Sequence, residues 1–95
     1  MNSLREVNKL DKIACIKNEL GLHARSAAQI AEIAKNSIGN VWLMKDDDKA
    51  DASSIIDILT LVCEKGTKIR IMIEDPADSA ILDAIVDLVE NGFGE

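Results

Sequence analysis

The alternation of apolar and polar residues predicts four β-strands. Residues 12–17 and 40–44 are short apolar runs between charged or turn-forming residues. Residues 68–74 alternate strictly, with three isoleucines on one side and charged residues or methionine on the other. Such alternation is typical of an antiparallel strand that is buried on one face. Residues 49–53 are a weaker candidate, placed by position alone.

Three further stretches have the 3.6-residue period of an amphipathic helix. The first spans residues 24–36, and its apolar face consists of Ala27, Ile30, Ala31 and Ala34. The second spans residues 53–66, and its apolar face consists of Ile55, Ile58, Leu59 and Val62. The third ends at Gly92, and its apolar face consists of Ile81, Leu82, Ile85, Leu88 and Val89.

Residues that favour helix ends mark the boundaries of the last two helices. The second helix has a capping pattern that begins at Ser54, and Gly66 is a suitable stop. The third begins with Asp75 as a cap and Pro76 at the first helical position. Asp78 lies in the first turn, where its charge would favour the positive end of the helix dipole.

The predicted order β-α-β-β-α-β-α gives an α+β fold. We expect an open-faced sandwich, in which a four-stranded antiparallel sheet carries three helices on one face. A chain of 95 residues is long enough for one domain with a modest core. We expect a polar leader at residues 1–9 and a single domain at residues 10–95. Because only 2% of the residues are aromatic, the core must consist of aliphatic side chains.

Composition and charge narrow the possible partners. The net charge of −6 argues against binding to nucleic acids or to anionic membranes. No apolar run indicates an export signal or a membrane span, so we expect a monomeric cytoplasmic protein. Cys15 and Cys63 are therefore expected to be buried thiols. With one histidine and no ligand spacing, we expect no metal site, and nothing indicates a cofactor.

The single histidine, His23, directly precedes the first predicted helix. As the N-cap it would lie beside the unpaired backbone N–H groups of Ala24, Arg25 and Ser26, which attract anions together with the helix dipole. Nδ1 would be the ring nitrogen nearest those groups, and the guanidinium of Arg25 suits phosphate oxygens. A neutral imidazole is a nucleophile. The pattern fits a histidine that faces a phosphate cradle, and it also fits a surface histidine with no role.

Two segments resemble one known family. "GLHARSAAQIAEIAK" and "ASSIIDILTLVCEKGTKIRI" resemble the active-site segment and the regulatory-serine helix of the histidine-containing phosphocarrier family, HPr, of the bacterial phosphoenolpyruvate-dependent phosphotransferase system. The resemblance extends over residues 10–95. It implies that His23 is phosphorylated at Nδ1, that Arg25 stabilises the phosphate, and that Ser54 is a regulatory position.

The resemblance also implies partners. The chain would accept phosphate from enzyme I and pass it to an EIIA domain, and a kinase or phosphorylase would act on Ser54. Ile55, Ile56 and Leu59 fall where the family docks its partners. The helical face places Ile55 and Leu59 in the core instead, whereas Ile56 lies off that face and is the better candidate for an exposed patch.

One residue departs from the family pattern. The family usually has proline after H-A-R, and Ser26 stands there in this chain. Serine restores one backbone N–H and adds a hydroxyl, so we expect an additional donor that favours an anion.

Two alternative functions remain open from the sequence. The segment "NELGLHARSA" is also similar to NPr, the carrier of the nitrogen-regulatory branch. The other alternative is a regulatory α+β binding domain that is not phosphorylated. The acidic run at residues 46–48 is interpreted as a solvated turn rather than a calcium site, because it lacks further ligands at EF-hand spacing.

Overall fold

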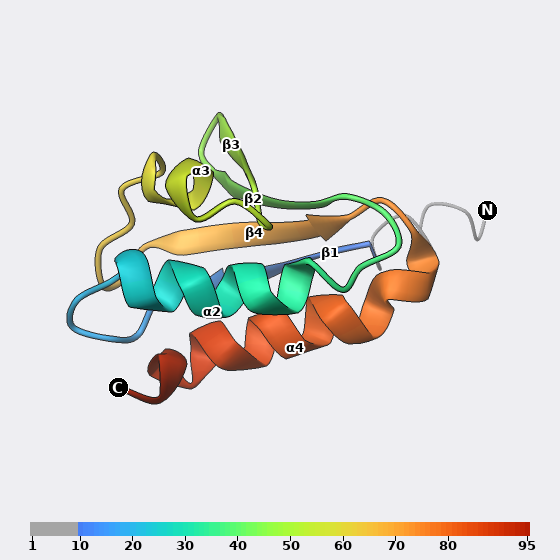
Figure 1. Ribbon diagram of the computed structural model, residues 1–95. Helices are drawn as coiled ribbons and strands as arrows, with labels where there is room; N and C mark the ends of the chain where they lie inside the picture. The colour runs from blue at the N-terminus through green and yellow to red at the C-terminus, as the bar shows by residue number, and fades with distance from the viewer. Residues whose placement is uncertain (1–9) are drawn as a thin grey trace.

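Residues 10–95 are described in the computed structural model, and the predicted leader lies outside them. Four strands form one antiparallel sheet in the spatial order β1-β4-β2-β3 (Figure 1). Their bounds are β1 Asp11–Cys15, β2 Val41–Lys45, β3 Asp48–Asp51 and β4 Lys68–Ile73. The predicted four-stranded antiparallel sheet is confirmed.

Three α-helices lie on one face of this sheet, as predicted. Their bounds are α2 Ala24–Ala34, α3 Ile55–Leu59 and α4 Ser79–Glu90, and two 3₁₀ helices flank α4, η1 Pro76–Asp78 and η2 Gly92–Gly94. The long helices α2 and α4 run side by side across the sheet, and the short α3 lies beside β3 (Figure 1). Within residues 10–95, no helix is long and apolar enough to cross a bilayer.

The core lies between the sheet and the helices, and it is almost wholly aliphatic. The alternation of β4 places its three isoleucines inward, and they meet the apolar stripes of α2 and α4. The largest fully buried side chains of this layer are Leu43, Ile69, Ile71 and Ile73 from the sheet and Ile30, Ile58, Leu82, Ile85 and Val89 from the helices. The predicted stripes of α2 and α4 therefore supply the helical half of the core.

The opposite face of the sheet is open, and the single tryptophan lies there. Trp42 is half-buried on β2, and its Nε1 donates to Glu74 at 2.8 Å. The ammonium group of Lys49 on the neighbouring strand stands 4.2 Å from the ring centroid, within cation–π range. Polar and charged neighbours thus hold this aromatic ring at the surface.

The second helix is shorter than its sequence pattern predicts. Helix α3 ends at Leu59, whereas the pattern extended to residue 66. Val62 has a φ of +52° and is 66% exposed, so its predicted place on the apolar face is wrong. The neighbours of Val62, Leu61 and Cys63, are both buried. Residues two apart point in different directions on a helix, so Leu61 and Cys63 could not both be buried on one helical face. The chain therefore leaves the helical conformation before them.

Asp78 lies in the first turn, as predicted, and its carboxylate also has a further role. Its side chain is 3% exposed and accepts hydrogen bonds from the backbone N–H groups of Ile38 and Gly39, both at 2.9 Å. Asp75 caps the first turn, which is the 3₁₀ helix η1, by accepting from Ala77. From this first turn, Asp78 therefore anchors the connection between α2 and β2.

The two cysteines differ in their surroundings. Cys63 is buried, as predicted, and burial raises the pKa of its thiol. Cys15 is only half-buried on β1, so the prediction of a buried thiol is wrong for this residue. The reason is strand alternation, because Ala14 and Ile16 on either side of it point into the core. Both cysteines are free thiols.

Candidate functional site

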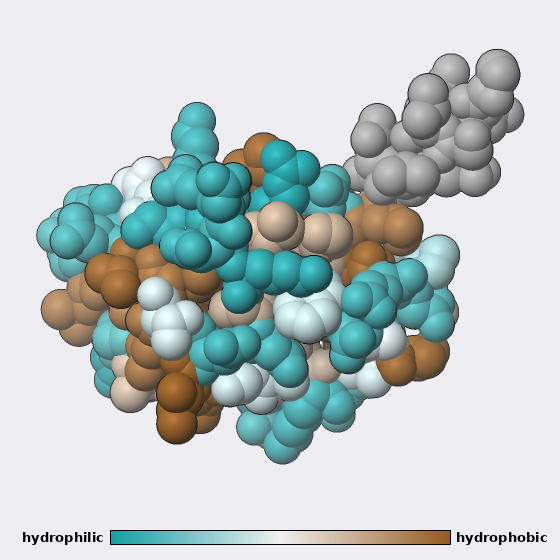
Figure 2. Space-filling view, turned by 90° about the horizontal axis from the view of Figure 1, so that it is seen from above, coloured by the Kyte–Doolittle hydropathy of each residue, from teal (hydrophilic) through white to brown (hydrophobic). Residues whose placement is uncertain are grey.

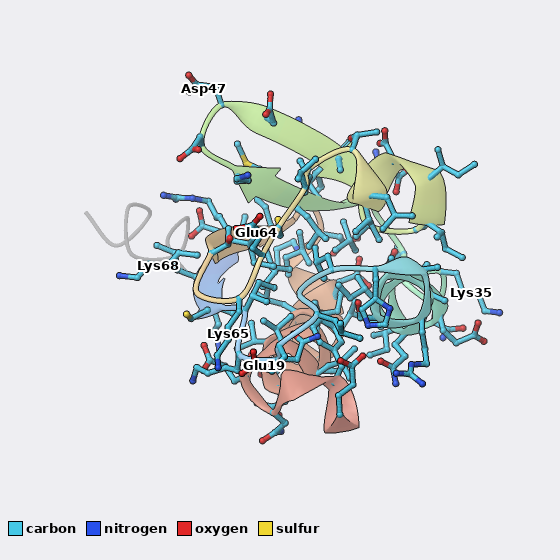
Figure 3. All side chains as sticks on the ribbon, turned by 90° about the vertical axis from the view of Figure 1, so that its left-hand side faces the viewer. Glu19, Lys35, Asp47, Glu64, Lys65 and Lys68 are labelled. Atoms are coloured by element: carbon cyan, nitrogen blue, oxygen red, sulfur yellow. The ribbon has the colours of Figure 1, made fainter. Side chains whose placement is uncertain are left out.

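A close contact between two loops positions the residues before α2. Gly21 has a φ of +66°, and a Cβ atom at this position would stand 2.2 Å from the carbonyl oxygen of Cys63. Only glycine fits there. The N–H of Leu22 donates to that same oxygen at 2.8 Å. The side chains of Glu19 and Lys65 form an ion pair between the same two loops (Figure 3).

These contacts place His23 at the N-cap of α2, as predicted. Its backbone is extended, with φ −138° and ψ −178°, and its carbonyl oxygen accepts the first helical hydrogen bond, from Ala27 at 2.8 Å. The helix therefore begins with the N–H groups of Ala24 and Arg25, which have no partner within the helix. His23 and the positive end of α2 face the same region.

Ser26 holds the backbone of His23 from inside the protein. Its side chain is fully buried, and its hydroxyl accepts from the N–H of His23 at 2.9 Å. The same hydroxyl lies 3.2 Å from the carbonyl oxygens of Gly21 and His23, to which it donates. The hydroxyl is therefore not a donor for an anion, because its hydrogen bonds are internal.

Two residues that the sequence analysis missed complete the site. The side-chain carboxylate of Glu95 places Oε2 2.6 Å from Nε2 of His23 and 3.5 Å from the guanidinium of Arg25. The buried amide of Asn18 donates to Oε1 of Glu95 at 2.9 Å and to the carbonyl oxygen of Gly21 at 2.8 Å. The hydrogen bonds from Asn18 and His23 lower the pKa of Glu95, so it is a carboxylate at neutral pH.

A tight turn brings Glu95 to the site. Gly92, Phe93 and Gly94 all have positive φ, and the ring of Phe93 is buried. Residues 92–95 therefore curl back from the end of α4 toward the start of α2 (Figure 1). The "GFGE" segment contains the signal for a turn, but not the direction in which the glutamate points.

Arg25 is the exposed member of the cluster. It follows His23 in the first turn of α2, and 69% of its side-chain surface is accessible. A long exposed side chain reorients at little cost, so the guanidinium can exchange the Glu95 carboxylate for another anion. His23, Arg25 and Glu95 thus form one cluster, although His23 and Glu95 lie 72 positions apart.

The second candidate region lies along α3. Ser54 is its N-cap, as predicted, and accepts from the N–H of Asp57 at 3.2 Å. Ile56 is 79% exposed, as expected for a surface patch. Ile55 is 39% exposed, so its predicted place in the core is wrong, and Leu59 is half-buried against the core. The difference arises because Ile58 and Leu61 fill the core beneath this short helix.

Ile55 and Ile56 line a shallow depression between α2 and α3, together with Ala28, Ala31 and Ser54. Figure 2 shows apolar side chains gathered at the end of the molecule where α3 lies. The site residues predicted from the sequence therefore form two regions, one at the start of α2 and one along α3.

Comparison with known proteins identifies the family. The model of the PTS HPr component phosphorylation site matches residues 10–91. The chain belongs to the HPr family of phosphocarrier proteins. It is 31% identical over 86 residues to phosphocarrier protein HPr of Cupriavidus necator, covering 90% of this chain and 97% of that protein. It is 34% identical over 89 residues to phosphocarrier protein NPr of Shewanella violacea, covering 94% of this chain and 98% of that one.

The fold agrees with solved HPr structures. The crystal structure of HPr from Thermoanaerobacter tengcongensis superposes with a TM-score of 0.83 at 35% identity, covering 90% of this chain and 96% of that one. The chain is an HPr-type phosphocarrier of the phosphotransferase system. The predicted family, fold and main function are thereby confirmed.

Proposed function

We propose that His23 carries the phosphoryl group on Nδ1, taking it from the phosphohistidine of enzyme I and giving it to an EIIA domain. The observation that carries this assignment is the place of His23, because it is the N-cap of α2, directly beside free backbone N–H groups. Its cytoplasmic location, where both partners would meet it, is part of the same proposal.

The chemistry is a direct exchange between two nitrogen atoms. The lone pair of Nδ1 attacks the phosphorus, the bond from phosphorus to the donor nitrogen breaks, and the donor ring keeps that electron pair. The phosphoryl oxygens then lie where the N–H groups of Ala24, Arg25 and Ser26 and the helix dipole favour negative charge. The side chain of Arg25 adds charge-assisted hydrogen bonds when it turns from Glu95 to the phosphate.

The exposed isoleucines of α3 are suited to partner binding. Ile56, with Ile55 and the half-buried Leu59 beside it, presents apolar surface next to Ser54. Exposed apolar patches of this kind commonly mark interaction sites. We assign Ile55, Ile56 and Leu59 to docking of enzyme I and EIIA, and Ser54 to regulation of that docking.

Incubation with phosphoenolpyruvate and enzyme I tests the assignment. Intact-mass measurement should find one acid-labile phosphoryl group on the wild type and none on His23→Ala. The variant should remain folded, because loss of an N-cap costs about 1 kcal/mol. Acceptance by a folded His23→Ala protein would assign the phosphoryl group to another residue.

Arg25→Ala should accept the phosphoryl group about tenfold more slowly and lose it sooner, since a hydrogen bond to a charged group is removed. Arg70→Ala is the matched control, because Arg70 is also an exposed arginine that pairs with a carboxylate, that of Asp11 on β1. If Arg25→Ala and Arg70→Ala both match the wild type in rate and lifetime, Arg25 has no part in the transfer.

A further inference from the structure

The carboxylate of Glu95 approaches one particular nitrogen of the His23 ring. Oε2 lies 2.6 Å from Nε2, and the two side chains retain only 16% and 27% of their accessible surface. Nδ1 is the other ring nitrogen, and the N–H of Ser26 faces the ring from the helix side. Glu95 and the start of α2 thus contact different parts of the ring.

This contact has a consequence for the proton of the ring. An ionised carboxylate only accepts hydrogen bonds, so at 2.6 Å the proton must reside on Nε2. A neutral imidazole has one N–H, and the other nitrogen then carries the lone pair. With Nε2 protonated, the lone pair is on Nδ1, the nitrogen that the phosphoryl transfer uses.

We propose that Glu95 is a positioning residue that holds the neutral His23 ring in the Nε2–H tautomer and so presents the lone pair of Nδ1 to the phosphorus. The proposal rests on the proposed phosphorylation of His23, and it adds a residue outside the H-A-R segment. Asn18 supports Glu95 in this role. Its donation to Oε1 fixes the rotation of the carboxylate, which leaves Oε2 for the ring.

The carboxylate also balances the charge that the transfer creates. When Nδ1 bonds to phosphorus, the Nε2 proton stays in place and the ring becomes a cation, so no proton has to leave. The ring faces a carboxylate on one side and the phosphoryl group on the other. In the return step Nδ1 recovers its electron pair, and the ring returns to the same neutral tautomer.

Glu95→Gln is a sharp test because Asn18 orients the new side chain. The amide oxygen of the glutamine should keep the hydrogen bond from Asn18, which turns its NH₂ group toward Nε2. An NH₂ group donates to an unprotonated Nε2 and therefore favours the Nδ1–H tautomer. The substitution should thus reverse the preference rather than merely weaken it.

The tautomer is directly measurable by ¹⁵N NMR, since His23 is the only histidine and gives a single pair of ring nitrogens. In the neutral wild type, Nε2 should give the signal of a protonated nitrogen and Nδ1 that of an unprotonated one. In Glu95→Gln, the Nδ1–H form should become the major one. The rate of phosphoryl acceptance should fall about tenfold, and Glu95→Asp should recover part of it.

Glu90→Gln is the matched control. Glu90 also accepts hydrogen bonds, from Lys17 and from the N–H of Cys15, and makes none to His23. It should leave the tautomer unchanged. If the tautomer is unchanged in folded Glu95→Gln, the proposal is overturned. This holds even if the rate of phosphoryl acceptance falls, because Glu95 would then act on the transfer through Arg25 rather than through the tautomer. If the phosphoryl group of the wild type is found on a residue other than His23, the proposed function is overturned. The tautomer is measured on the unphosphorylated protein, so the two tests are independent.

Discussion

Ser26 is the residue on which the geometry of His23 depends most directly. Its buried hydroxyl is the acceptor for the N–H of His23, and proline in its place would offer neither this hydroxyl nor a backbone N–H. The chain therefore fixes its histidine by a side-chain hydrogen bond. The backbone N–H of Ser26 faces the His23 ring at the start of α2.

Ser26→Ala should lower the free energy of unfolding by roughly 1–3 kcal/mol, because the N–H of His23 loses its buried acceptor. Thermal or denaturant unfolding measures the change. Ser53→Ala is the control, since the hydroxyl of Ser53 bonds Asp51 in an exposed position. Equal stability of the two variants would contradict the role of Ser26.

Comparison of Ser26→Ala with Ser26→Pro isolates the backbone N–H at this position. Both variants lack the hydroxyl, and only proline also lacks the N–H. We expect the phosphoryl group on Ser26→Pro to hydrolyse at a different rate from that on Ser26→Ala. Identical hydrolysis rates would show that the N–H of Ser26 does not contact the phosphate.

For single residues, the sequence was sufficient to predict only those features that depend on neighbouring positions in the chain. His23 and Ser54 were placed at helix N-caps correctly, since capping depends on a few neighbouring residues. Glu95 and Asn18 could not be assigned, because their contacts with the site exist only after the turn at residues 92–94 closes on the loop before α2. The inward direction of the Ser26 hydroxyl depends on that loop as well.

Among the elements, the 3₁₀ turn η1 does more than begin α4. It places Asp78 beneath the connection between α2 and β2, where the carboxylate accepts two backbone N–H groups. These donors would otherwise be left without a partner in a partly buried loop. The start of one helix thereby fixes the end of another.

Asp78→Ala should destabilise the protein by roughly 1–3 kcal/mol, because two backbone donors lose their acceptor. Asp83→Ala in α4 is the control, since Asp83 makes an exposed ion pair with Lys12 and such pairs contribute at most about 1 kcal/mol. Denaturant unfolding compares the two variants. Equal loss in both would contradict the anchoring role.

Periodicity predicted the elements well where one face meets the core over several turns or residues. Strand β4 and helices α2 and α4 meet this condition. The pattern marked all their buried residues except Ser26 of α2, although Ile81 and Leu88, which it also marked, are only partly buried. Helix α3 is too short for its period to be decisive. The burial of Leu61 and Cys63 on both sides of Val62 is set by tertiary packing, which the local sequence does not encode.

In the whole molecule, the site at His23 and the surface along α3 both adjoin helix α2. Helix α2 carries His23 at its start, and its exposed side borders the depression that Ile55 and Ile56 line. A partner that covers α3 would thus also meet α2. A charge at Ser54 would therefore act on partner binding rather than on the chemistry at Nδ1.

Ser54→Asp should retain near-native stability, because aspartate is also a good N-cap. It should raise the KM for phosphorylation by enzyme I, since a partner surface that covers Ile55 and Ile56 must desolvate the new charge. Initial rates against carrier concentration measure the effect. Ser54→Ala is the control, because it removes the cap without adding charge. A wild-type KM for Ser54→Asp, or an equal rise in Ser54→Ala, would contradict this role.

The most direct test of the account is to locate the phosphoryl group on the histidine ring. The protein labelled with ¹⁵N in His23 is phosphorylated by phosphoenolpyruvate and enzyme I, and the coupling between ³¹P and the ring nitrogens is measured by NMR. We predict coupling of phosphorus to Nδ1, while Nε2, which faces Glu95, keeps its proton. A phosphoryl group on Nε2, or on a residue other than His23, would contradict the account.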